Sequence, residues 1–263
     1  MKTIEGGICA PQGYRAGAVS AKIKNANVTK KDCALIVSDV PAVIAGCFTT
    51  NQVKAAPVQW SQGVCIRGVA RAVFINSGNA NACTGTQGIE DTQATAEAVA
   101  LGLDVPITEV AIMSTGVIGA LLPMDRIRNG VEGCIPALNV NGSHDAALAI
   151  MTTDTVPKEI AVEVALPTGT VRIGAICKGA GMICPDMATM LCTVTTDAKV
   201  EQAVLGAALR QAVEKSFNRV CIDNDMSTND TVLCLANGLS GVAIAEGTEA
   251  LETFSAALTF VCQ

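Results

Sequence analysis

The sequence predicts an α/β fold in which mixed β-sheets are layered against flanking helices. Apolar runs of strand length, rich in Val and Ile, recur between glycine or asparagine turns. Longer segments place apolar residues at the spacing of amphipathic helices. A chain of 263 residues can bury a substantial core, and because only 3% of these residues are aromatic, aliphatic side chains and cysteine must fill it.

Seven apolar runs are predicted to form strands. In chain order they span 33–39, 42–50, 72–78, 109–115, 160–166, 170–177 and 190–196. The fifth and sixth runs flank the turn sequence "PTG", so we expect them to pair as a β-hairpin.

Five segments with helical periodicity are predicted to form helices. They span 89–103, 124–138, 143–153, 200–217 and 249–263. Several carry Asp or Glu in the first turn, which suits the positive end of the helix dipole. The last segment stops without a glycine, a cap or a polar tail, so we expect the sequence to be a fragment of a longer one.

Charge and hydropathy argue against several classes of partner. The net charge is −6, and no basic cluster exceeds "KK" at 30–31, which argues against nucleic acid and anionic membranes as partners. The N-terminus lacks a signal-peptide pattern, and the chain contains no apolar run long enough to span a membrane. We therefore expect a soluble cytoplasmic protein.

Twelve cysteines raise the question of a disulfide framework or a metal site. They occur singly in apolar surroundings, without a CxxC pair or a cluster of ligands. We interpret them as small core residues in a reducing compartment, and we expect neither a zinc site nor any other metal.

Five segments hold more Gly, Asn, Ser and Thr than packing requires. They are 76–85, 114–119, 152–158, 178–191 and 223–231. Each follows or ends a predicted element, where loops gather polar groups around a site. Any one of them alone would be read as an ordinary turn. An alternative interpretation of "KGAG" at 178–181 is a phosphate-binding loop, but the order of its residues does not match the P-loop pattern.

The segment "MATM" suggests a nucleophile that needs no histidine. The one histidine, His144, stands at the start of a predicted helix, where a solvated capping role is the simpler interpretation. Threonine requires a base close by, and a cut between Ala188 and Thr189 would supply the α-amine of Thr189, with a pKa of about 8. The turn "STGVIG" at 114–119 offers backbone N–H groups for a developing oxyanion.

Taken in order, several long segments resemble the ornithine acetyltransferase family, also called the glutamate N-acetyltransferase or arginine-biosynthesis bifunctional family. They are "KKDCALIVSDVPAVIAGCFTTNQVKAAPV", "NSGNANACTG", "STGVIG", "MTTDTVPK", "KGAGMICPDMATMLCTVTTDA" and "SFNRVCIDNDMSTNDTVLCLANG". The resemblance runs from about residue 6 to the end. It implies a fold similar to the N-terminal-nucleophile-like fold of ornithine acetyltransferases and DmpA.

The resemblance also implies an activity and a maturation step. Such a precursor cleaves itself at Ala188–Thr189 into an α chain, here 1–188, and a β chain that begins with 189–263, and the two assemble as α2β2. Thr189 accepts the acetyl group of N-acetylornithine and passes it to glutamate, giving ornithine and N-acetylglutamate. No cofactor is implied, although acetyl-CoA is a further candidate donor.

Site residues follow from the matching motifs. The resemblance makes Thr115 and Gly116 the oxyanion-hole pair, whereas Thr152, Lys178 and Thr189 bind substrate. Lys178 would pair with a substrate carboxylate, and its alternative role is that of a solvated lysine at a turn. Because family members continue past residue 263, we expect the pocket in this chain to be incomplete.

Two other functions remain open from the sequence. One is a hydrolase that uses the same N-terminal nucleophile, like the related aminopeptidases. The other is a non-catalytic amino-acid-binding protein in which the polar loops hold a ligand and no cleavage occurs. Mass spectrometry separates the second from the enzymes, because only an enzyme of this kind requires a break before Thr189.

Overall fold

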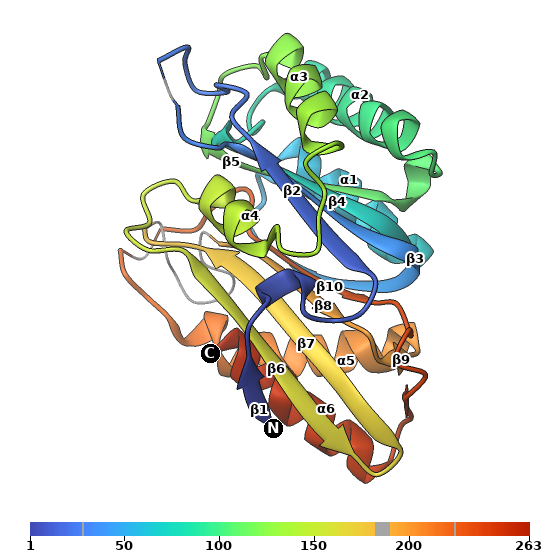
Figure 1. The fold of residues 1–263 in the computed structure, drawn as a ribbon. Coiled ribbons are helices and arrows are strands. Elements are labelled where there is room, and N and C mark those ends of the chain that lie inside the picture. Colours follow the sequence, from blue (N-terminus) through green and yellow to red (C-terminus); the bar gives the residue numbers. More distant parts are fainter. Residues whose placement is uncertain (28, 182–189, 224) are drawn as a thin grey trace.

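This computed structural model describes residues 1–27, 29–181, 190–223 and 225–263. The main sheet of the described chain has the order β1 (Lys2–Ile4), β6 (Lys158–Leu166), β7 (Gly169–Lys178), β8 (Leu191–Thr196), β10 (Thr231–Ala236), β3 (Cys33–Phe48), β4 (Val69–Asn79) and β5 (Val110–Val117), with β2 (Tyr14–Val19) paired to β3. This sheet divides into two half-sheets: β2, β4 and β5 lie on one side of the long strand β3, and β1, β6, β7, β8 and β10 on the other. The first half of β3 pairs with β2 and the second half with β10. Figure 1 shows the two half-sheets one above the other.

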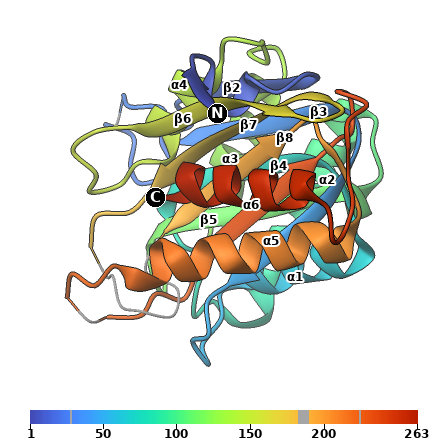
Figure 2. The same cartoon turned by 90° about the horizontal axis from the view of Figure 1, so that it is seen from below.

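The helices are α1 (Ala56–Arg67), α2 (Gly85–Leu103), α3 (Met124–Cys134), α4 (Ser143–Ile150), α5 (Gln202–Lys215) and α6 (Glu249–Cys262). Helices α2, α3, α5 and α6 cover the outer faces of the two half-sheets, whereas α4 packs into the inner core against β2, β3 and β7, and α1 packs along β5. Figure 1 places α2 and α3 outside the β4–β5 half, and Figure 2 shows α5 and α6 side by side across the other half. Short elements complete the chain: β9 (Lys199–Val200), β11 (Ala243–Ile244), and the 3-10 helices η1 (Gly7–Cys9), η2 (Ile107–Glu109) and η3 (Phe217–Arg219).

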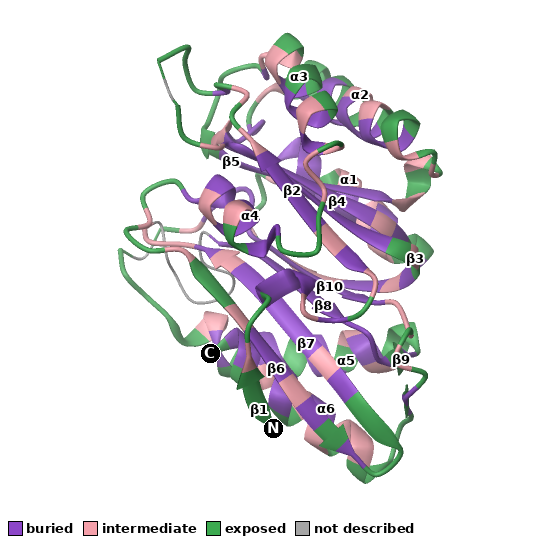
Figure 3. Ribbon diagram, viewed as in Figure 1, coloured by how far each residue is buried: buried purple, intermediate pink, exposed green. Residues whose placement is uncertain are grey.

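Alternation along the strands separates the core into layers. On β4, Val73 and Ile75 face the inner core, whereas Ala72 and Phe74 face α2 and α3. Leu233 and Leu235 of β10 complete the inner core from the opposite half-sheet. This period-2 burial produces the layered sandwich that the sequence predicts. Figure 3 shows the buried strands between helices that are exposed on their outer sides.

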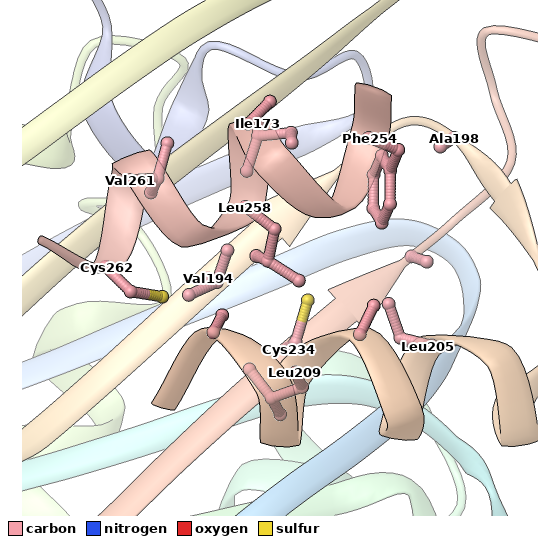
Figure 4. Close-up of a cluster of buried hydrophobic side chains, with 14 of the residues drawn as sticks. Ile173, Val194, Ala198, Leu205, Leu209, Cys234, Phe254, Leu258, Val261 and Cys262 are labelled. Atoms are coloured by element: carbon pink, nitrogen blue, oxygen red, sulfur yellow. The ribbon is translucent and has the colours of Figure 1, made fainter. Parts of the chain in front are cut away.

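A second apolar layer lies between the helices α5 and α6 and the half-sheet that contains β6, β7, β8 and β10. Leu209 of α5, together with Phe254 and Leu258 of α6, packs against Val194 of β8 and Cys234 of β10 (Figure 4). Both strands and both helices come from the chain after residue 189, whereas β7 and β3 on either side of the strands come from before it. The two predicted chains therefore share one sheet and one core.

Most predicted elements are confirmed, and the hairpin of β6 and β7 pairs Leu166 with Gly169 as expected. The predicted runs 33–39 and 42–50 are wrong as separate strands, because both belong to β3. The register against β4 shifts between Val37 and Ala42, and the Arg71 guanidinium donates to the backbone carbonyls of Ser38 and Asp39 at this irregularity. Those bonds satisfy carbonyls that the bulge removes from the ladder.

Three of the longer elements are absent from the sequence prediction, namely α1, β2 and β10, as are the short elements β1, η1, β9 and β11. The first has weak amphipathicity and begins "APV", so it lacks a clear helical stripe. The other two, "YRAGAV" and "TVLCLA", are short runs without a hairpin turn beside them.

The cysteine interpretation holds for part of the set. Cys9, Cys33, Cys134, Cys192, Cys234 and Cys262 are buried and free, as expected for core residues. Cys83 and Cys221 are exposed, so the interpretation is wrong for them, and Cys184 lies outside the described residues. Within the described ranges, no group of three or more His, Cys, Asp or Glu could hold a metal, and no helix could cross a membrane.

Candidate active site

Two polar segments meet where the parallel strands β4 and β5 end. Ser77 pairs with Thr115 and Gly78 with Gly116 in the ladder. Gly116 has a φ of +134°, and a Cβ added there would lie 2.3 Å from the carbonyl carbon of Gly78. Only glycine therefore fits at 116, and its backbone can approach the neighbouring strand closely.

Asparagines of the 76–85 segment hold the 114–121 turn in place. Ser114 Oγ donates to Asn76 Oδ1 at 2.6 Å, and Asn76 Nδ2 donates to the carbonyl of Asn79 at 2.9 Å. Asn79 Nδ2 in turn donates to the carbonyls of Ala120 and Leu121. The sequence predicts that this segment belongs to a site, and its described role is to fix the backbone that carries Thr115.

Lys178 ends β7 inside the protein, not at its surface. Its residue is only 2% exposed, so the alternative of a solvated lysine at a turn is wrong. Nζ lies 3.4 Å from Thr115 Oγ1, which makes Lys178 a neighbour of the predicted oxyanion pair. Burial lowers the pKa of Lys178, although the nearby carboxylates of Asp154 and Asp230 oppose that shift.

Asp154 connects the 152–158 loop to Lys178, and sequence reasoning did not single it out. Oδ1 accepts from the Gly179 amide at 2.7 Å and from Lys158 Nζ at 2.6 Å, and Oδ2 accepts from the Thr152 amide at 3.2 Å. Burial alone would raise the pKa of Asp154, but these hydrogen bonds lower it below its ordinary value. Its position two residues after Thr152, in "TTD", was the available signal.

A cavity of about 520 Å³ opens between these elements. Thr115, Gly116, Thr152 and Lys178 all line it, so the structure brings together the four predicted site residues that it describes. Lys24, Lys30 and Asp32 also line the cavity and were not predicted. Two of these are held by the backbone: Lys30 Nζ donates to the carbonyl of Met151, and Asp32 accepts from the amides of Ala21 and Ile23.

Ala188 and Thr189, the predicted cleavage pair, lie outside the described residues. The adjoining residue Met190 is buried, and its amide donates to Asp230 Oδ1 at 2.9 Å. Leu191 then pairs with Lys178 across the β7–β8 ladder. The chain therefore enters β8 two positions after Thr189, beside the strand end that carries Lys178.

His144 stands at the start of α4, where the sequence placed it. Its side chain is 61% exposed, and Nδ1 lies 2.6 Å from Glu159 Oε1. The cavity lining does not include it. A solvated helix-start residue is the role that this geometry supports.

Comparison with known proteins identifies the family that this sequence matches. The sequence profile of the ArgJ family matches residues 15–263. An arginine biosynthesis bifunctional protein ArgJ from Symbiobacterium thermophilum is 51% identical over 241 residues, which cover 92% of this chain. The chain spans 60% of the length of that relative.

Two solved structures support the fold. An ornithine acetyltransferase from Mycobacterium tuberculosis, complexed with ornithine, is 43% identical with a TM-score of 0.64, and the match covers 72% of this chain and 99% of that one. An l-aminopeptidase d-ala-esterase/amidase from Ochrobactrum anthropi, described as a variant of the ntn hydrolase fold, has a TM-score of 0.60 at 12% identity over 98% of this chain and 84% of that one. The predicted fold class is thereby confirmed.

Proposed function

Because this chain belongs to the ArgJ family, we propose that it carries the nucleophile and oxyanion site of a glutamate N-acetyltransferase of arginine biosynthesis. The acetyl group of N-acetylornithine passes to Thr189 and then to glutamate, and acetyl-CoA is a second candidate donor. One observation carries this proposal: Thr115, Gly116, Thr152 and Lys178 line one cavity, beside the strand that begins just after Thr189.

Acetyl transfer follows from the chemistry of these groups. The α-amine of Thr189 takes the hydroxyl proton, and the hydroxyl oxygen attacks the acetyl carbonyl carbon. The hydroxyl of Thr115 and the backbone N–H of Gly116 stabilise the oxyanion, with Lys178 as a nearby cation. When the C–N bond breaks, the departing ornithine amine takes the proton back. Glutamate then attacks the acetyl-threonine through its own amine by the same steps in reverse.

Cleavage before Thr189 accounts for the availability of that α-amine. The match to the ornithine acetyltransferase covers 72% of 263 residues, about 189 residues, and 99% of the solved chain. A solved chain of this length is what cleavage after Ala188 would produce. The two products would stay together, because β8 and β10 lie between β7 and β3 in one sheet. We propose an α2β2 assembly of these chains.

The bound small molecules are expected to be amino acids. The ornithine acetyltransferase from Mycobacterium tuberculosis was solved in complex with ornithine. In this chain Thr152 and Lys178 line the cavity and would bind the polar groups of such a substrate, with the ammonium of Lys178 facing a carboxylate.

An acceptor assay tests the activity against its hydrolase alternative. The full-length protein is incubated with N-acetylornithine, with and without glutamate, and in parallel with acetyl-CoA. An acetyltransferase forms N-acetylglutamate in step with ornithine, whereas a hydrolase releases ornithine and acetate at the same rate without glutamate. The second result, or no turnover of either donor, would overturn the proposal.

A further inference from the structure

Cysteines from five different elements line the apolar layer between the sheet and the helices α5 and α6. They are Cys47 of β3, Cys177 of β7, Cys192 of β8, Cys234 of β10 and Cys262 of α6. Figure 4 shows Cys234 and Cys262 in this layer. The proposed function gives none of these thiols a role, and no three of them are placed to hold a metal within the part of the chain that the structure describes.

Cys177 and Cys192 lie directly opposite each other on neighbouring antiparallel strands. The β7–β8 ladder pairs these two residues, and the next pair along is Lys178 with Leu191. Opposite residues in such a ladder point to the same face of the sheet, with Cα atoms about 4.5–5.5 Å apart. A disulfide requires Cα atoms about 4.4–6.8 Å apart, so the backbone already meets this requirement.

The two thiols interact, but they differ in their access to solvent. Interaction with Cys177 is the largest cause that raises the pKa of Cys192 well above its ordinary value, and burial adds to it. Cys192 is 1% exposed, whereas Cys177 is half-buried, and its thiol donates to the carbonyl of Lys178 at 3.7 Å. Cys177 is therefore the sulfur that a small oxidant reaches first, and Cys192 is a second sulfur held beside it.

The other cysteines of the layer are less suited to bond with Cys192. Cys234 lies on the parallel neighbour β10, two positions beyond Val232, the residue opposite Cys192. A strand spacing of about 4.8 Å and a rise of about 6.6 Å over two residues place its Cα about 8 Å away. Cα atoms more than about 7 Å apart are not bridged without movement of the backbone. Cys262 reaches the layer from α6, so no ladder fixes its distance from Cys192.

We propose that Cys177 and Cys192 form an oxidation site, at which a peroxide converts the two thiols into a disulfide that fastens β7 to β8 beside Lys178. The Cys177 sulfur attacks one oxygen of hydrogen peroxide, and the O–O bond breaks to give a sulfenic acid and water. The Cys192 sulfur then attacks the sulfenic sulfur, the S–O bond breaks, and the departing hydroxide takes the Cys192 proton. Two thiols and one peroxide thus give one disulfide and two waters.

The disulfide changes the geometry next to Lys178. Opposite Cβ atoms lie about 4.5–5.5 Å apart in a sheet but about 3.8 Å apart in a disulfide, so the two strands must draw together by about 1 Å. Lys178 directly follows Cys177, and its Nζ lies 3.4 Å from Thr115 Oγ1, so this displacement reaches the cavity. The disulfide itself does not depend on the proposed function, whereas its effect on acetyl transfer rests on that function.

Peroxide treatment of the full-length protein tests the site. The wild type, Cys177→Ser and Cys192→Ala are incubated with hydrogen peroxide, their free thiols are alkylated, and their peptides are mapped by mass spectrometry without reduction. In the wild type we expect two peptides joined through Cys177 and Cys192, and dithiothreitol should separate them. Neither variant should form this link, and the half-buried position of Cys177 makes its serine variant the safer of the two for folding.

Acetyl transfer from N-acetylornithine to glutamate is measured on the same samples. Before oxidation, the three proteins should agree in kcat within about 2-fold, because neither cysteine lines the cavity. Oxidation should lower the kcat of the wild type roughly 5-fold or more, since a misplacement of about 1 Å costs up to about 10²-fold. The kcat of both variants should stay unchanged, and dithiothreitol should restore that of the wild type.

Cys65→Ser is the matched control. Cys65 of α1 is half-buried like Cys177 and lies near a second thiol, that of Cys47, but no ladder pairs the two. This variant should keep both the Cys177–Cys192 link and the loss of kcat. The exposed thiols of Cys83 and Cys221 are present in every protein of the series, so their oxidation does not account for a difference between the variants.

Each remaining outcome overturns the oxidation site or separates it from the proposed function. A wild type without the Cys177–Cys192 link, or with either sulfur joined to another cysteine, overturns it. A link that leaves kcat unchanged, or a loss of kcat that persists in Cys177→Ser, overturns it as well. If the reduced wild type transfers no acetyl group, the proposed function fails, and the link between the two peptides alone decides the oxidation site.

Discussion

Gly116→Ala is expected to disable catalysis through the backbone, without removing any functional side chain. A Cβ at this position would lie 2.3 Å from Gly78 C and 2.5 Å from Asn79 N, both on β4. Ordinary contacts begin at 3.4 Å, so one strand must move by about 1 Å. The φ of +134° is also unfavourable for alanine and adds about 1–3 kcal/mol of strain.

A displacement of this size acts on the predicted oxyanion pair directly. Misplacing a reacting group by about 1 Å costs roughly 10²-fold, and loss of one oxyanion donor costs about 10²- to 10³-fold in kcat. We therefore expect Gly116→Ala to lower kcat at least 10²-fold, with a smaller change in KM. Steady-state transfer from N-acetylornithine to glutamate measures both constants, and thermal unfolding measures the strain.

Gly119→Ala is the matched control in the same turn. Gly119 also has a positive φ, +83°, but no atom lies within 4 Å of an added Cβ. It should lose about 1 kcal/mol of stability and keep kcat within a few-fold of the wild type. Equal losses of kcat in the two variants, or a normal kcat in Gly116→Ala, would refute the argument from close approach.

Three further substitutions test the roles of Thr115, Lys178 and His144. Thr115→Ala should lower kcat roughly 10²-fold while KM stays closer to normal, and a change confined to KM would count against the oxyanion assignment. Lys178→Met should abolish most transfer without lowering Tm at pH 7, because the lowered pKa of Lys178 means that its buried charge opposes folding there; a large loss of Tm would contradict this. His144→Ala should keep activity within about 2-fold and leave the pH profile unchanged; loss of an ionisation would call for a histidine base.

The fold class can be predicted from the sequence because it depends on local patterns of residues. Alternation in β4 and the turn in the β6–β7 hairpin each depend on residues within one or two elements. The single strand β3 was not predictable in this way, since Asp39 and Pro41 read as a turn. At the bulge, Arg71 from another strand donates to the carbonyls of Ser38 and Asp39, a contact that the sequence of β3 alone does not reveal.

In the candidate site, sequence motifs predict some of the residues, whereas contacts between segments far apart in the chain are seen only in the structure. Thr115, Gly116, Thr152 and Lys178 were named from motif positions, and the structure places all four around one cavity. Asp154 could not be assigned from the sequence, because its role depends on the Gly179 amide, a contact between segments far apart in the chain.

Asn229 and Asp230 illustrate the limit most clearly. The sequence predicts a polar segment around them, but only the fold reveals that one side chain binds Ser114 and the other Met190. Distances across a parallel pair such as β8 and β10 depend on register, which a single sequence does not specify.

The central claim is a covalent acetyl group on an N-terminal threonine, and intact-mass and peptide analysis after acid quenching tests it most directly. The full-length protein is mixed with N-acetylornithine labelled in the acetyl group and quenched before and after glutamate is added, with Thr189→Ala as the control. We predict two chains, a new N-terminus at Thr189, label on Thr189 that disappears with glutamate, and an uncut, unlabelled Thr189→Ala protein. Transfer by an uncut wild-type chain, cleavage of Thr189→Ala at the same junction, or label on any other residue would contradict the account.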